Sequence, residues 1–152
     1  MTTHSEPSRG KIVVGVDGSA SSQQALRWAA RQARLTGAEL HAISAWDYPT
    51  TPEWAFVLET GDRWSENARK DVDDAVTASL DPDDAERVQR SVVQGYPARA
   101  LLDAAADADL LVVGSRGRGG MVGMLLGSVS QHAVTNARCP VVVVRGEPNT
   151  PE

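Results

Sequence analysis

The sequence predicts an α/β protein with one doubly wound parallel sheet and helices on both of its faces. Two observations lead to this class. Short β-branched runs alternate along the chain with longer segments whose apolar residues recur at helical spacing. The chain has 152 residues, 41% of them hydrophobic and 23% charged, which suits a single globular domain.

The amino-terminal elements follow in order. Residues 12–16 form a short apolar run that predicts a buried strand. Ser19 then suits the N-cap of a helix over residues 20–35, and Gly37 suits the position just after it. Residues 39–46 predict the second strand.

The middle of the chain is less regular. Prolines make residues 49–61 an irregular stretch, and residues 62–80 place apolar side chains along one face of an exposed helix. The Asp-Pro-Asp-Asp segment at residues 81–84 ends this helix, and residues 86–93 predict the third strand.

The carboxyl-terminal half continues the alternation. The predicted elements are a helix over residues 98–107, a strand over 109–114, a helix over 127–136 and a strand over 140–145. We expect one domain over residues 11–145, with flexible tails at residues 1–10 and 146–152.

Composition excludes several classes of function. A net charge of −5 argues against a nucleic-acid-binding face. The single cysteine, Cys139, cannot form an internal disulfide, and the three histidines lack zinc-ligand spacing. The polar start has no apolar signal segment, and the apolar run Val141–Val144 is far too short to cross a bilayer. These features predict a cytoplasmic protein with no membrane partner.

Two predicted strands end in glycine-containing turns, at residues 15–19 and from residue 114 onward. Open parallel sheets bind ligands beyond the carboxyl ends of their strands. If the two strands are neighbours, both turns therefore face one crevice.

The second turn has the features of a phosphate site. Gly114 and Gly117 have no Cβ to obstruct a ligand, and Gly127 with Ser128 begins a helix whose free N–H groups attract anions. Hydroxyls of Ser128 and Ser130 can add hydrogen bonds. The alternative is a flexible glycine loop in which Ser128 is an ordinary N-cap.

Other glycine motifs do not fit this segment. It has no lysine, as a Walker A loop requires. The dinucleotide fingerprint lacks its last glycine here and is not beside the first strand. Residues 127–131 lack the final glycine of a nucleophile elbow.

The spacing Gly114-x2-Gly117-x9-Gly127-Ser128 resembles the adenine-nucleotide motif of universal stress proteins. Residues 12–19, 95–117 and 139–144 resemble other segments of that family, in the same order. The resemblance extends over about residues 11–145.

The resemblance implies a five-stranded sheet of order 3-2-1-4-5, with ATP across the ends of strands 1 and 4. It implies that Gly15 and Ala45 lie near the adenine, and Val113 and Gly114 near the ribose. It places Asp17 on the ribose or on a magnesium ion, and adds Val16 to the binding set. The residues implied to hold the phosphates are Gly117, Gly127, Ser128, Val129 and Ser130.

Several of these residues have structural alternatives. Asp17 after a strand can form an Asx turn. Arg116 and Arg118 can contact phosphates or simply be solvated. We expect Cys139 to be a small buried hydrophobic residue, and His132 to be a structural surface or core residue and not a base. Of the tryptophans at positions 46, 54 and 64, one could cover the adenine; otherwise all three serve packing.

The function implied by the resemblance is that of an ATP-binding regulator or sensor. No Walker lysine or placed base supports efficient hydrolysis, so no catalytic residue is predicted. The alternatives are a slow ATPase or nucleotide hydrolase, a cyclic-nucleotide-binding protein, and a dimer whose nucleotide is structural. An exposed edge strand and the resemblance both predict a homodimer through Val141–Val144. The sequence predicts no specific protein partner besides a second copy of the chain.

Overall fold

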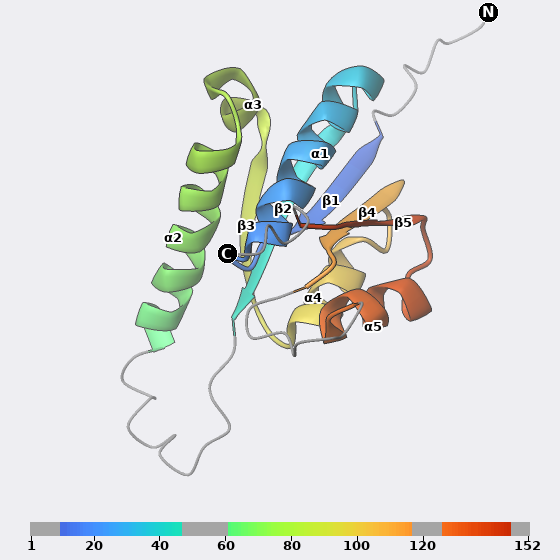
Figure 1. The fold of residues 1–152 in the computed structure, drawn as a ribbon. Helices are drawn as coiled ribbons and strands as arrows, with labels where there is room; N and C mark the ends of the chain where they lie inside the picture. The colour runs from blue at the N-terminus through green and yellow to red at the C-terminus, as the bar shows by residue number, and fades with distance from the viewer. Residues whose placement is uncertain (1–9, 47–60, 117–125, 147–152) are drawn as a thin grey trace, which may run out of the picture.

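The computed structural model describes residues 10–46, 61–116 and 126–146. Its centre is a five-stranded sheet in which all pairs are parallel and the order is β3-β2-β1-β4-β5 (Figure 1). This confirms the predicted class and strand order. The strands are β1 (Lys11–Gly15), β2 (Glu39–Trp46), β3 (Gln89–Gln94), β4 (Leu110–Gly114) and β5 (Val141–Val144).

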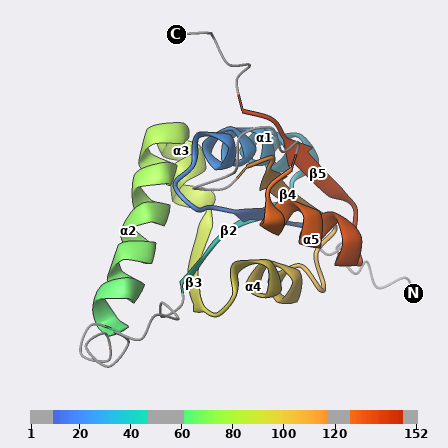
Figure 2. The ribbon, with the colours of Figure 1, turned by 60° about the horizontal axis from the view of Figure 1, so that its bottom comes forward.

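Helices cover both faces of the sheet, as predicted. Helices α1 and α2 lie on one face, and α4 and α5 lie on the other (Figure 2). Their bounds are α1 (Ala20–Thr36), α2 (Gly61–Ser79), α4 (Pro97–Ala104) and α5 (Ser128–Asn136).

A short helix, α3 (Pro82–Arg87), lies where the sequence predicted a break and the start of a strand. The Asp81 carboxylate accepts a hydrogen bond from the Asp84 N–H at 2.9 Å, and Pro82 occupies the first turn. The residues that end α2 therefore also begin a new helix. The third strand starts at Gln89 instead of residue 86 for this reason.

Alternate strand residues build two cores, one on each face. Val14 and Val112 pack with α1 and α2, whereas Val13 and Leu111 pack with α4 and α5. All four are fully buried. This is the pattern expected of central strands in a sheet covered on both faces.

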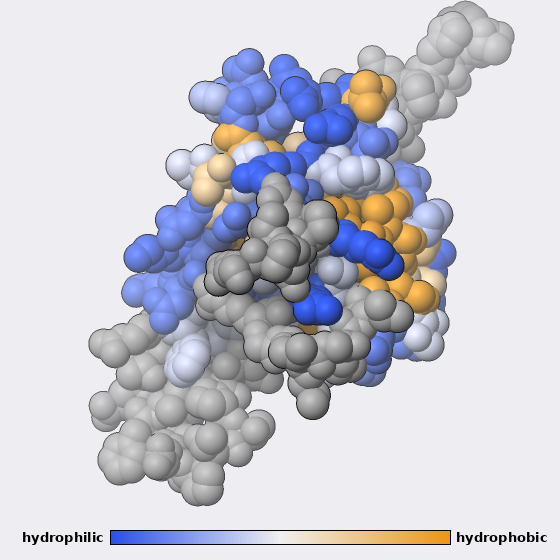
Figure 3. Space-filling model, viewed as in Figure 1, coloured by the Kyte–Doolittle hydropathy of each residue, from blue (hydrophilic) through white to orange (hydrophobic). Residues whose placement is uncertain are grey.

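The edge strand β5 is less enclosed than the centre. All four valines of β5 are half-buried, and apolar side chains gather on this side of the molecule (Figure 3). Within the described ranges, no helix is long and apolar enough to cross a membrane.

Candidate nucleotide site

The carboxyl ends of β1 and β4 lie side by side. Ile12 pairs with Leu110 and Val14 with Val112, so the turns that follow the two strands share one edge of the sheet. The predicted adjacency is confirmed. Helix α1 begins directly after the first turn, and α5 begins at the same edge.

The first turn is shaped by Asp17 and Gly18. Asp17 Oδ1 accepts a hydrogen bond from the Ser19 N–H at 2.9 Å, which is an Asx turn. Gly18 has a φ of 82°, a conformation that favours glycine. The Ser19 hydroxyl caps α1 by accepting from the Ser22 N–H at 3.2 Å. Asp17 thus has the structural role named as its alternative, while its side chain stays exposed to solvent.

Serines at the start of α1 hold the turn after β4. The Arg116 carbonyl accepts hydrogen bonds from the hydroxyls of Ser19, at 3.2 Å, and Ser21. The Arg116 N–H lies 3.3 Å from the Ser21 hydroxyl oxygen, to which it donates. This role of Ser21 was not predicted from the sequence. Its only signal is the run of serines around a helix cap, which is common in proteins without such a contact.

Two glycines at this edge are required by helix packing. A Cβ on Gly114 would lie 2.5 Å from the Ser21 hydroxyl oxygen, and a Cβ on Gly15 would lie 2.8 Å from a methyl of Leu101 on α4. From the sequence, the space beside Gly114 was predicted to admit a ligand. The structure shows that α1 occupies it.

At the start of α5, the backbone N–H groups of residues 128–130 have no hydrogen-bond acceptor among the described residues. Gly127 is its N-cap and has no side chain with which to cap the helix. The first intrahelical bond runs from the Gln131 N–H to the Gly127 carbonyl at 3.0 Å, so the N–H groups of residues 128–130 precede the helical ladder. The Gly127 N–H donates to the Ser115 carbonyl at 2.7 Å and so fixes this helix start beside β4.

The two serines of α5 differ in their surroundings. Ser128 is exposed, whereas Ser130 is only 2% exposed and donates its hydroxyl hydrogen to the Gly114 carbonyl. A serine hydroxyl has one hydrogen to donate. While it holds Gly114, Ser130 therefore cannot also donate from its side chain to a phosphate.

Comparison with known proteins identifies this arrangement. The model of the universal stress protein family matches residues 8–145. The chain belongs to the universal stress protein family. A universal stress protein from Mycolicibacterium smegmatis is 38% identical over 141 residues, which are 90% of this chain and 48% of the relative. The chain thus spans about half the length of the curated relatives it matches.

Solved universal stress proteins share the fold. One from Lactobacillus plantarum has a TM-score of 0.70 and 25% identity, over 91% of this chain and all of the other. A universal stress protein in complex with cAMP has a TM-score of 0.59 and 31% identity, over 93% of this chain and all of the other.

The other predicted site residues of this universal stress protein differ in exposure. Val16 and Val113 are 4% and 3% exposed, and their side chains pack in the cores on the two faces of the sheet. Ala45 is half-buried near the end of β2, where it pairs with Val93. The Arg116 side chain is exposed. Gly117, Arg118 and Trp54 lie outside the described residues.

Three further sequence predictions concern Cys139, His132 and a metal site. Cys139 is half-buried and packs with the α4 and α5 core, as a small hydrophobe would. His132 meets the Tyr96 ring edge-on, with ring centroids 6.3 Å apart. Across residues 10–46, 61–116 and 126–146, no three His, Cys, Asp or Glu side chains are grouped to hold a metal ion.

Proposed function

We propose that this universal stress protein binds an adenine nucleotide, ATP in the first place, beyond the ends of β1 and β4. The observation that carries this proposal is the uncapped start of α5, fixed beside the turns of both strands. Unpaired N–H groups and the positive end of a helix dipole together favour phosphate. Family membership and the published complex of a relative with cAMP support an adenine nucleotide.

The phosphates would contact the backbone N–H groups of residues 128–130 and the exposed Ser128 hydroxyl. The exposed Arg116 guanidinium would add charge, and Gly117 would complete the loop. Ser130 would act through its N–H, since its hydroxyl holds Gly114. The adenine would lie near Gly15, Val16 and Ala45, and the ribose near Asp17, Val113 and Gly114. This list follows the family motif as it stands in the chain.

Asp17 would also face a magnesium ion carried by the phosphates. Mg²⁺ is commonly held by one or two carboxylates together with substrate phosphates and water. A single exposed carboxylate fits that arrangement, and it does not form a metal site without the nucleotide. When bound, the ion would neutralise phosphate charge.

The proposed role is regulatory. Among the described residues of the turns after β1 and β4 there is no lysine or histidine to act on the phosphates, and His132 on α5 contacts the Tyr96 ring. Fast hydrolysis would need such a group or an equivalent base. A slow ATPase is the second candidate. A cyclic nucleotide is a further ligand candidate, favoured by the cAMP complex of the relative.

We also propose a homodimer formed through β5. Its four valines are half-buried at an open edge of the sheet. A parallel edge strand has unpaired backbone groups, which a second copy can cover.

Two experiments test the nucleotide proposal. Mass spectrometry of small molecules released from the denatured, purified protein would identify a co-purifying nucleotide. Calorimetry with ATP, cAMP and adenosine then compares wild type with Asp17→Ala and with Asp83→Ala, an exposed aspartate on α3. Weaker ATP binding only in Asp17→Ala supports the site. Equal affinity in all three proteins removes Asp17 from it, and no nucleotide binding at all refutes the proposal.

A further inference from the structure

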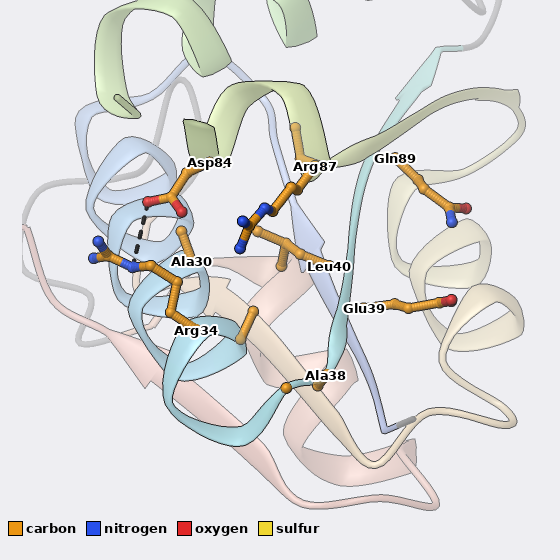
Figure 4. Close-up of a pocket in the computed structure, with 11 residues that line it drawn as sticks. Ala30, Arg34, Ala38, Glu39, Leu40, Asp84, Arg87 and Gln89 are labelled. Carbon is orange, nitrogen blue, oxygen red and sulfur yellow. Dashed lines mark ion pairs between the residues drawn. The ribbon is translucent and has the colours of Figure 1, made fainter. Parts of the chain in front are cut away.

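A pocket lies at the end of the sheet opposite the nucleotide site. It is bounded by the last turns of α1, the start of β2, and the segment from α3 into β3 (Figure 4). Its volume of about 590 Å³ is within the range of small-molecule sites. No motif of the sequence pointed to it, because its walls come from three separate stretches of the chain.

One part of the lining is apolar. The apolar side chains come from all three walls: Ala30, Ala33, Ala38, Leu40 and Val88. Three of these are alanines, which leave space where a larger side chain would fill the gap. An apolar group entering the pocket would bury its surface against these residues.

The charged side chains that line the pocket differ in whether they have an ion-pair partner. Arg34 Nε lies 3.4 Å from Asp84 Oδ2, and this aspartate is only 8% exposed. Glu39 points away from the cavity in Figure 4, and its carboxylate lies 3.4 Å from His41 Nε2. Arg87 extends from α3 toward Leu40. Across the described ranges, Arg87 has no ion pair or side-chain hydrogen bond.

We infer that this pocket binds a small amphipathic anion, a molecule with one carboxylate or phosphate group on an apolar body. The body would lie on the alanine-rich lining, and the anion would pair with the Arg87 guanidinium, which can bind an oxyanion through two N–H groups. Arg34 would add a second positive charge, partly neutralised by Asp84. The Asp84 and Asp81 carboxylates disfavour a ligand with several negative charges.

This site does not depend on nucleotide binding. The two sites are at opposite ends of α1: Ser19 and Ser21 hold the turn after β4, whereas Ala33 and Arg34 line the pocket. The same helix therefore contacts both regions, and a ligand in the pocket has direct contact with the element that forms part of the nucleotide site.

The test is a two-dimensional amide NMR titration of the full chain with three probes of equal chain length: octanoate, octyl phosphate and octylammonium. We expect saturable shifts from at least one of the two anions at the amides of Gly37, Leu40 and Val88, and no saturable shifts there from the cation. The anion with the lower Kd identifies the preferred head group. No saturation by either anion at about 10 mM, or equal binding of the cation, overturns the inference.

Two variants distinguish the pocket from non-specific binding. Arg87→Gln removes the charge, and we expect the Kd of the bound anion to rise about fivefold, as for a partly exposed ion pair. Ala33→Leu fills the cavity and should abolish the saturable shifts. The matched control is Arg99→Gln, an exposed arginine on α4 at the other face of the sheet. If the folded Arg87→Gln protein binds both anions like Arg99→Gln, the inference is wrong.

Discussion

The Cβ that Gly114 lacks would lie 2.5 Å from the hydroxyl oxygen of Ser21. This contact is where the end of β4 meets the start of α1, and the same serine bonds the Arg116 backbone in both directions. On the other side of the strand, the Ser130 hydroxyl donates to the Gly114 carbonyl. Serines from two helices thus fix the position at which β4 enters its glycine-rich turn.

We predict that Gly114→Ala lowers the free energy of unfolding by about 1–3 kcal/mol, the cost of overpacking a closed site. Truncating Ser21 to glycine should not restore stability, because the Ser21 carbonyl carbon and the Ser22 nitrogen would still lie 2.7 and 2.8 Å from the new methyl. Urea denaturation measures both variants. The matched control is Gly146→Ala, whose Cβ would have its nearest neighbour at 3.7 Å. Equal stability of the two alanine variants would contradict this packing.

At Gly15 we expect that the loss of stability can be relieved by a second substitution, because the nearest atom is a methyl group of the Leu101 side chain. The new Cβ of Gly15→Ala would lie 2.8 Å from Leu101 Cδ1. Leu101→Ala alone should cost about 2–5 kcal/mol. The double variant should lose less stability than the sum of the single variants, since the smaller residue 101 makes room for the methyl. Additive losses in a double-mutant cycle would show that the two residues do not compete for space.

Much of the fold could be predicted because the signals were local. The β-branched runs around Val13 and Leu111 and the cap residues Ser19 and Gly37 each act through their own neighbours in the sequence. The strand order came from the family resemblance instead, since spacing alone does not say which strands pair. Helix α3 was missed because Asp-Pro segments at residues 81–84 signal both the end of one helix and the start of another.

The candidate site was predictable in its position but not in its internal bonding. Glycine spacing pointed to the start of α5, which begins at Ser128 after the N-cap Gly127, as predicted; the binding role of these residues stays a prediction. The sequence could not show that the Ser130 hydroxyl donates to the Gly114 carbonyl, or that α1 occupies the space beside Gly114. Both contacts join segments that are far apart in the chain. The pocket at Arg87 could not be predicted from the sequence either, because its lining residues come from three separate segments of the chain.

Cys139 should react slowly in the folded protein. Burial raises the pKa of its thiol, so less of the reactive thiolate is present near pH 8 than for a free cysteine. The chain has one cysteine, so Ellman's reagent reports this site alone. We expect the rate in native protein to be well below the rate in denaturant, and the difference to narrow as the pH rises above the thiol pKa. Equal rates in the two states would contradict the burial.

The proposed dimer is tested on both faces of β5. Val142 packs on the α1 side of the sheet and Val143 on the α5 side. A lysine at either residue would place charge at an interface through this strand, so at least one of Val142→Lys and Val143→Lys should sediment as a monomer. Circular dichroism must show that each variant is folded. Unchanged sedimentation of both folded variants would place any dimer contact elsewhere.

The two serines of α5 allow the phosphate assignment to be separated from a structural effect. Ser128 is exposed at the first position of the helix, so Ser128→Ala should leave the free energy of unfolding nearly unchanged. If its hydroxyl binds phosphate, the variant should bind ATP about tenfold or more weakly, because a hydrogen bond to a charged group contributes about 1.5–3 kcal/mol. Adenosine, which has no phosphate, should bind the variant as it binds wild type.

Ser130→Ala should lower stability without a selective loss of ATP binding, the reverse of what we expect for Ser128→Ala. Its hydroxyl is buried on the Gly114 carbonyl, so the variant should lose about 1–3 kcal/mol of stability. Any change in affinity should then be shared by ATP and adenosine, since the whole turn is loosened. Thr135→Ala, at an exposed position of the same helix, is the control for both. Titration of both ligands against the four proteins decides the assignment: if folded Ser128→Ala binds ATP within about twofold of wild type, its hydroxyl does not contact phosphate.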